Sequence, residues 1–200
     1  MSQIYEDEAM IDFTDLPPII LASQSPRRKK ILEEAGFTFK VVSADVEEET
    51  LTTASETVQA NAKMKCEAVA QNYPDHLIIA ADTVVSLNER ILEKPDNLNE
   101  AKEMLKALSG RSHEVMTAVS LIYNDREVGF MDTSKVHFND LNDEKISKYI
   151  SKVTPLDKAG AHNIDEEGSL IIEKFEGEYQ NIMGLPIRSL IRELKKIKKS

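Results

Sequence analysis

One apolar run constrains the fold of this chain more than any other feature of its sequence. Residues 77–85 are apolar apart from Asp82 and Thr83. A continuous apolar run, in place of an alternating one, is typical of a strand whose two faces are both covered by other elements. The sequence therefore predicts that residues 77–85 form the central strand of a sheet.

Strand-like and helix-like segments alternate along the rest of the chain. Hydrophobic patterning predicts strands at residues 19–22, 37–42, 77–85, 115–123, 127–138 and 170–172, with 127–138 antiparallel to its neighbour. It predicts helices at residues 26–35, 54–73, 97–108 and 143–151, and a terminal helix from Leu185. This alternation indicates an α/β fold.

Composition limits the class of protein. The 200 residues suffice for one domain with a core or for two small lobes, and their net charge of −10 disfavours broad adhesion to nucleic acid or to anionic membranes. A phosphate ligand would therefore need a local basic pocket. The single cysteine, Cys66, has no second thiol to pair with, which fits a reducing cytoplasm.

The two ends of the chain carry opposite charges. Residues 1–15 contain five acidic side chains and no basic one, which is the opposite of a signal peptide. Residues 191–200 contain five Lys or Arg, as expected of a solvated helix end. No apolar stretch approaches the ~18 residues of a membrane span, so no membrane partner is expected.

A polar turn before the first helix is the first candidate ligand site. Ser23 precedes Ser25, an expected N-cap, and Pro26 takes the first helical position. Arg27 and Arg28 follow, so two guanidiniums lie where the free N–H groups of a helix attract anions. The pattern indicates a phosphate site, although an ordinary cap followed by a basic helix face would give the same residues.

Asp82 is the second candidate, because a carboxylate inside an apolar run is costly to bury without a partner. We expect it at the end of its strand, facing a cleft. There it can ligate Mg²⁺ or take a proton from an attacking water. The alternative interpretation is a structural aspartate that caps the next turn.

Other residues give weaker signals. Lys94 follows an expected hairpin at residues 88–90 and can neutralise phosphate charge or belong to a surface ion-paired turn. Glu48 stands in an acidic run that is equally typical of a solvated loop. The histidines lack the spacing of zinc ligands, and neither a Gly-rich phosphate loop nor a Gly-x-Ser-x-Gly elbow occurs in the sequence.

Six motifs follow one another along residues 19–194. They are Leu21-Ala22-Ser23-Gln24-Ser25-Pro26-Arg27-Arg28, Ala80-Ala81-Asp82-Thr83-Val84-Val85, Glu93-Lys94-Pro95, Ser109-Gly110-Arg111-Ser112-His113, Asp157-Lys158-Ala159-Gly160-Ala161 and Asn181-Ile182-Met183-Gly184-Leu185-Pro186. In this order and spacing they resemble the Maf family. The acidic leader at 1–18 falls outside the resemblance. For residues 19–200 the resemblance implies one catalytic domain, with an elongated, two-lobed mixed sheet and a central cleft similar to inosine triphosphate pyrophosphatases.

The resemblance also implies an activity and a set of site residues. Such enzymes are often dimers and hydrolyse nucleoside triphosphates between the α- and β-phosphates with Mg²⁺ or Mn²⁺. Asp82 would be the general base or metal-linked acid, and Glu48 a second acidic group at the metal. The phosphates would be held by Ser23, Arg27, Arg28, Lys65 and Lys94. Substrate specificity would depend on Arg27, Thr83 and Asp165.

One position departs from the branch of the family that acts on dTTP and UTP. Members of that branch usually carry Gly-Ile-Gln after the Ala-Gly-Ala motif, whereas this chain has Asn163-Ile164-Asp165. An ionised aspartate only accepts hydrogen bonds, whereas glutamine also donates, so the pocket can favour a different base edge. We expect a pyrophosphatase for dTTP, UTP or a modified pyrimidine nucleotide.

Two other classes of function stay open. The chain can be a nucleotide-binding regulator of cell division and septum formation without essential catalysis, but the intact Asp82 favours an enzyme, since a sensor can discard the acid. It can also be a structural division-linked protein that docks through its acidic leader.

Overall fold

The computed structural model describes residues 16–124 and 126–198, so nearly all of the predicted leader lies outside the described residues. The strands are β1 (Ile19–Leu21), β2 (Phe39–Val41), β3 (Leu77–Leu87), β4 (Arg90–Leu92), β5 (Ser112–Tyr123), β6 (Arg126–Phe138) and β7 (Ile172–Glu176). The helices are α1 (Pro26–Glu34), α2 (Ala54–Ala70), α3 (Leu98–Leu108), α4 (Asp143–Lys152), α5 (Tyr179–Ile182) and α6 (Ile187–Lys198). Two 3₁₀ turns, η1 (Ala159–Ala161) and η2 (Gly168–Leu170), complete an α/β fold, as predicted.

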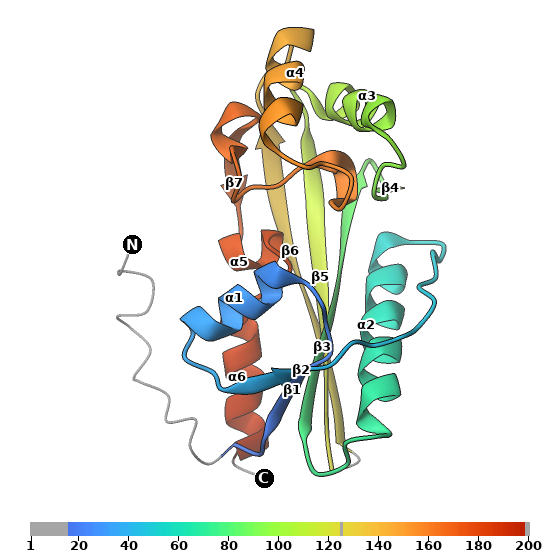
Figure 1. Ribbon diagram of the computed structural model, residues 1–200, viewed down its shortest axis with the longest axis vertical. Coiled ribbons are helices and arrows are strands. Elements are labelled where there is room, and N and C mark those ends of the chain that lie inside the picture. Colours follow the sequence, from blue (N-terminus) through green and yellow to red (C-terminus); the bar gives the residue numbers. More distant parts are fainter. Residues whose placement is uncertain (1–15, 125, 199–200) are drawn as a thin grey trace.

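One mixed sheet extends along the molecule. Its order is β2-β1-β3-β5-β6-β7, and β4 pairs with the far end of β3. β1 is parallel to β2 and β3, whereas β3, β5, β6 and β7 are antiparallel, which confirms the antiparallel direction predicted for residues 127–138. Figure 1 shows β3, β5 and β6 along the long axis, with β1 and β2 at one end.

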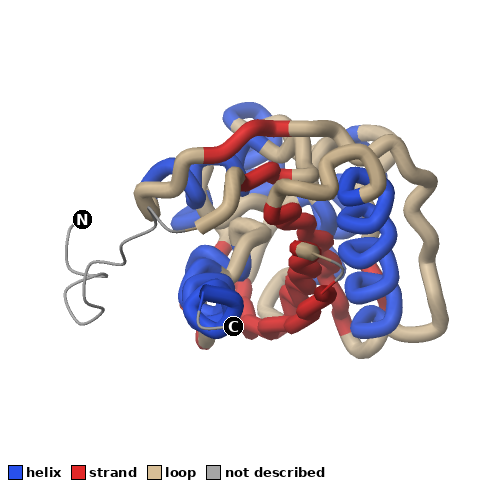
Figure 2. Tube along the Cα trace, turned by 90° about the horizontal axis from the view of Figure 1, so that it is seen from below, coloured by secondary structure: helices blue, strands red, loops and turns tan. Residues whose placement is uncertain are grey.

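The central strand β3 is covered on both faces, as its composition predicts. Ile79 packs in one cluster with Leu190 of α6, whereas Ile78 packs with Cys66 of α2. Neighbouring residues of a strand point to opposite faces, so α6 and α2 lie on opposite sides of the sheet, as Figure 2 shows. Burial raises the pKa of the Cys66 thiol to about 12, so this cysteine is an inert part of the core.

The prediction that Asp82 ends its strand is wrong, because β3 continues to Leu87. The buried Asp82 carboxylate lies 2.7 Å from the ammonium of Lys65 on α2. This partner offsets the cost of burial, so the strand can pass through the charged position. Alternation along β3 then places Asp82 on the α2 side of the sheet and Thr83 on the α1 side, where it contacts Arg28.

The other end of the sheet carries a second hydrophobic cluster, formed by α3, α4 and the segment before β7 (Figure 1). The strand predicted at 170–172 is wrong in its bounds, because η2 ends at Leu170 and β7 extends from Ile172 to Glu176. β7 is an edge strand with mostly exposed residues, so no apolar pattern marks it. The helix predicted at 54–73 ends at Ala70, and the terminal helix begins at Ile187.

Two breaks in pairing leave part of β3 open. β1 pairs with β3 as far as Ile79, and β4 pairs with it from Val85 onward. Within the described residues, no strand pairs with 81–84 on that edge. The carboxyl ends of the adjacent parallel strands β1 and β2 therefore border a gap beside β3. Such a gap is the usual place for a ligand in an open α/β sheet. None of the described helices is long and apolar enough to cross a membrane.

Candidate active site

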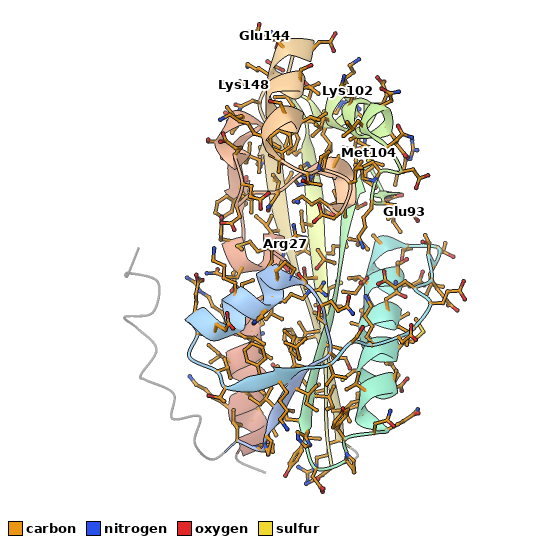
Figure 3. The ribbon with its side chains drawn as sticks, in the orientation of Figure 1. Arg27, Glu93, Lys102, Met104, Glu144 and Lys148 are labelled. Atoms are coloured by element: carbon orange, nitrogen blue, oxygen red, sulfur yellow. The ribbon has the colours of Figure 1, made fainter. Side chains whose placement is uncertain are left out.

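A cavity of about 430 Å³ lies along the open edge of β3. Its wall combines β3 with the turn before α1, the loop before α2, α2 itself, the segment after β4 and residues from 157–166 and 182–184. It brings together every predicted site residue except Asp165, namely Ser23, Arg27, Arg28, Glu48, Lys65, Asp82, Thr83 and Lys94. Arg27 lies at the end of α1 nearest the centre of the molecule (Figure 3).

The polar turn before α1 is a helix cap and a cavity wall at the same time. The Ser25 side chain caps the helix by accepting from the Arg28 backbone N–H, and Pro26 takes the first turn. The buried Ser23 hydroxyl accepts from the Ser25 N–H at 3.3 Å and from Arg28 Nη1 at 3.1 Å. The two interpretations of this motif are therefore compatible.

Arg28 begins a directed chain of hydrogen bonds. Its Nε donates to the Gly184 carbonyl at 2.8 Å, and its Nη2 donates to Thr83 Oγ1 at 3.1 Å. Thr117 gives its only hydroxyl hydrogen to the Asn181 carbonyl at 2.9 Å. Thr83 must therefore donate in its 3.0 Å contact with Thr117, and toward a ligand the Thr83 hydroxyl can only accept.

Gly184 is required by this chain of contacts. Its φ of 105° lies in the left-handed region, and a Cβ atom would lie 3.2 Å from Thr83 Oγ1 and 3.4 Å from Arg28 Nε. Burial lowers the pKa of the Arg28 guanidinium, whereas the nearby Asp82 carboxylate raises it. The sequence signals this region only through the motif at 181–186, whose partners in space it does not specify.

Lys65 joins the two predicted metal ligands. Its ammonium lies 2.7 Å from Asp82 Oδ1 and 2.8 Å from Glu48 Oε1. Lys65 and Asp82 are buried, while about half of the Glu48 side chain is exposed. Partial burial raises the pKa of the Glu48 carboxyl, but Lys65, Lys94 and Arg28 outweigh this and hold that pKa below its ordinary value. Two carboxylates thus converge on one point of the cavity.

The loop that carries Glu48 is fixed to α2. Asn61 Oδ1 accepts from the Glu49 N–H, and Asn61 Nδ2 donates to the Glu49 carbonyl, both at 2.9 Å. Thr57 Oγ1 accepts from the Leu51 N–H at 2.9 Å. The acidic run is therefore a positioned segment. Sequence reasoning missed Asn61 and Thr57, whose signal was a polar side chain on the buried face of a helix.

Lys94 reaches the cavity from the segment after β4. The expected hairpin is present, with Asn88 and Glu89 at φ values of 50° and 67°. Glu93 accepts from Thr50 Oγ1 at 2.9 Å, which ties this turn to the loop that carries Glu48. Lys94 makes no ion pair with any residue in 16–124 or 126–198, so its charge is available to a ligand.

The donor set fits a hard divalent cation only together with a ligand. Glu48 and Asp82 supply carboxylate oxygens that suit Mg²⁺ or Mn²⁺. The described part of the chain contains no group of three or more His, Cys, Asp or Glu that could hold a metal alone. Magnesium is commonly bound by one or two carboxylates and by substrate phosphates, so this pair is sufficient if phosphate completes the coordination.

Comparison with known proteins identifies the family. The family model described as Maf-like protein matches residues 18–197 of this chain. The chain belongs to the Maf family. The dTTP/UTP pyrophosphatase of Bacillus cereus (strain ATCC 10987 / NRS 248) is 46% identical over 183 residues, which cover 90% of this chain and 90% of the relative. The dTTP/UTP pyrophosphatase of Bacillus anthracis (strain CDC 684 / NRRL 3495) is 46% identical over 179 residues, which cover 88% and 94%.

In this Maf chain Asp165 lines neither the large cavity nor the small one beside it. Its carboxylate lies 3.5 Å from Lys30 Nζ and accepts from the Tyr179 hydroxyl at 3.4 Å. Its backbone N–H donates to Asn163 Oδ1 at 3.2 Å. The specificity role of Asp165 stays a prediction, and its contact with the cavity is indirect, through Asn163.

The Maf chain also buries two histidines that the sequence did not pair. His113 Nε2 and His162 Nε2 are 3.2 Å apart, and His162 follows the Ala-Gly-Ala motif in the segment that borders the cavities. Burial lowers the pKa of His113 to about 2 and that of His162 to about 4. Both imidazoles are therefore neutral in the folded protein at neutral pH, so one ring can donate to the other.

Acidification is expected to destabilise the Maf fold through this pair. Below the ordinary histidine pKa of about 6.5 the unfolded chain binds protons that the folded chain does not, so stability is present above that pH and is lost as pH falls. Between about pH 7 and about pH 5 the expected loss is about 2 kcal/mol for each histidine. Urea unfolding at the two pH values measures it. His162→Gln should remove about half of the pH-dependent change in the free energy of unfolding that the two histidines contribute. If the pH dependence of this variant equals that of the wild type, His162 is not one of the groups responsible.

Proposed function

We propose that this chain is a nucleoside triphosphate pyrophosphatase that releases a nucleoside monophosphate and pyrophosphate. The observation that carries the proposal is one cavity in which the Asp82–Lys65–Glu48 bridge lies among Arg27, Arg28 and Lys94. We propose dTTP, UTP or modified pyrimidine nucleotides as substrates, a choice that the names of the two relatives support.

The cations and the Ser23 turn account for binding of the triphosphate. A triphosphate carries several negative charges, and the transition state of its hydrolysis places more charge on the phosphate oxygens. Arg27 and Lys94 border the cavity, and the guanidinium of Arg28, with three donors used inside the protein, has two N–H groups left for phosphate. A cavity of about 430 Å³ is within the usual size range for a site of this kind.

Asp82 is the proposed general base. Its Oδ1 is held by Lys65 at 2.7 Å, which fixes the direction of the carboxylate. Its Oδ2 has no hydrogen-bond donor among the described residues and is not sealed from the cavity. Oδ2 is therefore free to take a proton from a water that attacks the α-phosphorus. Asp82 and Glu48 would hold Mg²⁺ or Mn²⁺, which when bound neutralises charge on the phosphate oxygens.

We further propose that the protein acts in the cytoplasm, as a homodimer, without a nucleic acid or membrane partner. The net charge of −10 supports the absence of nucleic acid and anionic lipid partners, and the lone cysteine suits a reducing compartment. The dimer rests on the family resemblance.

Pyrophosphate release from a panel of nucleoside triphosphates tests the proposal. With Mg²⁺ or Mn²⁺, kcat/KM for dTTP and UTP is expected to exceed that for dCTP, dATP and dGTP by about tenfold or more, because the base pocket discriminates by hydrogen bonds. Chelation with EDTA should stop release, and added metal should restore it. Tight triphosphate binding without release would instead support the alternative of a nucleotide-binding regulator of cell division.

A further inference from the structure

We propose that Asn163 selects the base, by donating a hydrogen bond from its side-chain amide to the 4-carbonyl oxygen of uracil or thymine. This inference rests on the proposed function, because it assumes a pyrimidine nucleotide in the cavity. It assigns to Asn163 the contact that the family resemblance would give to Asp165.

Asn163 lies where two cavities adjoin. A small cavity of about 30 Å³ adjoins the large one, and Asn163 borders both. The residues common to the two linings are Arg27, Thr83, Ala159, Asn163 and Ile182. Glu48, Lys65 and Lys94 border only the large cavity, so the shared residues mark the part of its wall that adjoins the small cavity. The apolar walls of Ala159 and Ile182 suit the faces of a planar ring there.

The orientation of the Asn163 amide follows from its neighbours. The backbone N–H of Asp165 lies 3.2 Å from Asn163 Oδ1, and an N–H group can only donate. The oxygen of the amide must therefore face the loop, and the NH₂ group points elsewhere. Asn163 Nδ2 has no hydrogen-bond acceptor within residues 16–124 and 126–198. The Asn163 backbone is also fixed, because its N–H donates to the hydroxyl of the fully buried Tyr149 at 2.8 Å.

The Asn163 amide is therefore a donor without an acceptor among the described residues, and such a donor selects a ligand that carries a carbonyl oxygen. Uracil and thymine have an acceptor, O4, at the position where cytosine has the N4 amino donor, whereas O2 is common to all three. A hydrogen-bond donor on Asn163 therefore favours uracil and thymine, which accept at position 4, over cytosine, which donates there.

Asp165 is less suited to this contact. It borders neither cavity, and its carboxylate is engaged by Lys30 and Tyr179. Its role is to position the loop, since its backbone N–H orients the Asn163 amide. Substitutions at Asn163 and at Asp165 are therefore expected to have different effects on base selection.

The test is the ratio of kcat/KM for UTP to that for CTP in Asn163→Asp protein. Aspartate keeps the oxygen that accepts from the Asp165 N–H, so the loop is preserved, but it replaces the donor by an acceptor. The UTP:CTP ratio should fall by about 10- to 100-fold. Repulsion of the triphosphate by the new charge affects both nucleotides equally and cancels in the ratio. Asn142→Asp is the matched control, because it makes the same change at the N-cap of α4, outside both cavities, where aspartate also caps well.

Two results would overturn the inference. An unchanged ratio in Asn163→Asp would show that the amide reads the sugar or the phosphates, and a shifted ratio in Asp165→Asn alone would return base selection to Asp165. The ratio of the dissociation constants of UTP and CTP, measured for Asp82→Asn and for Asp82→Asn/Asn163→Asp proteins, makes the same comparison without turnover. If the wild type binds but cleaves neither nucleotide, the proposed function fails while this comparison still decides the role of Asn163.

Discussion

Asp82→Asn is expected to lower kcat for pyrophosphate release by about 10²- to 10⁴-fold, the usual contribution of a general base. The amide of asparagine cannot take a proton from water and is a poorer metal ligand than a carboxylate. Its oxygen can still accept from Lys65 Nζ, which lies 2.7 Å from Asp82 Oδ1, so we expect the fold and triphosphate binding to persist. Single-turnover pyrophosphate release and equilibrium binding of UTP measure the two effects separately.

Asp132→Asn is a suitable control for this variant. Asp132 lies on β6, outside the cavity, and accepts from Ser189 Oγ at 2.7 Å, a bond that asparagine can keep. It should retain the wild-type rate. Near-normal release by Asp82→Asn protein of wild-type thermal stability would remove Asp82 from the role of base. Loss of release and of UTP binding together with a loss of thermal stability would indicate a structural role.

Lys65→Met is expected to reduce kcat/KM by about 10²- to 10³-fold, a loss typical of removing one well-placed electrostatic group from an active site. Methionine has a similar length but no charge, so the carboxylates of Asp82 and Glu48 would face each other without the cation that joins them. Because Asp82 is buried, we also expect the free energy of unfolding to fall by about 3 kcal/mol. Urea unfolding and steady-state kinetics measure the two effects.

Lys63→Met provides the matched control on the same helix. Lys63 Nζ is paired with Glu67 and Glu127, but half of its side chain is exposed, so its loss should change stability far less than the loss of Lys65 and leave the rate unaltered. Equal kinetic losses in the two variants would show that the rate depends on the total positive charge of α2 and not on the position of Lys65 in the cavity. A Lys65→Met protein that is less stable but fully active would show that Lys65 stabilises the fold and does not contribute to catalysis.

Much of the local structure could be predicted from the sequence, because it depends on contacts between near neighbours. The continuous apolar run of 77–85 predicted a central strand, and β3 is buried throughout except at Thr83. Ser25 and Pro26 predicted the start of α1. The extent of β7 beyond Ile172 could not be predicted, because an edge strand has no covered face to impose an apolar pattern.

The residue types of the candidate site could also be predicted, whereas their contacts could not. Family motifs indicated the residue types, and the cavity contains all of the predicted residues except Asp165. The motifs could not indicate the Arg28–Thr83–Thr117–Asn181 chain, because its direction depends on the register of β3 against β5 and on which hydroxyl hydrogen is already used.

The fold class, the position of the central strand and the charged groups available for a phosphate ligand follow from hydrophobic pattern and residue chemistry, so the order of amino acids is enough to predict them. The contacts of Lys65 with Asp82 and Glu48, the contact of His113 with His162, and the place of Asn163 at the cavities became known only from the folded chain. Such contacts depend on strand register and on the face of the sheet to which each side chain points. A shift of one residue along a strand reverses that face, and the pattern of apolar residues fixes it only where a core is formed.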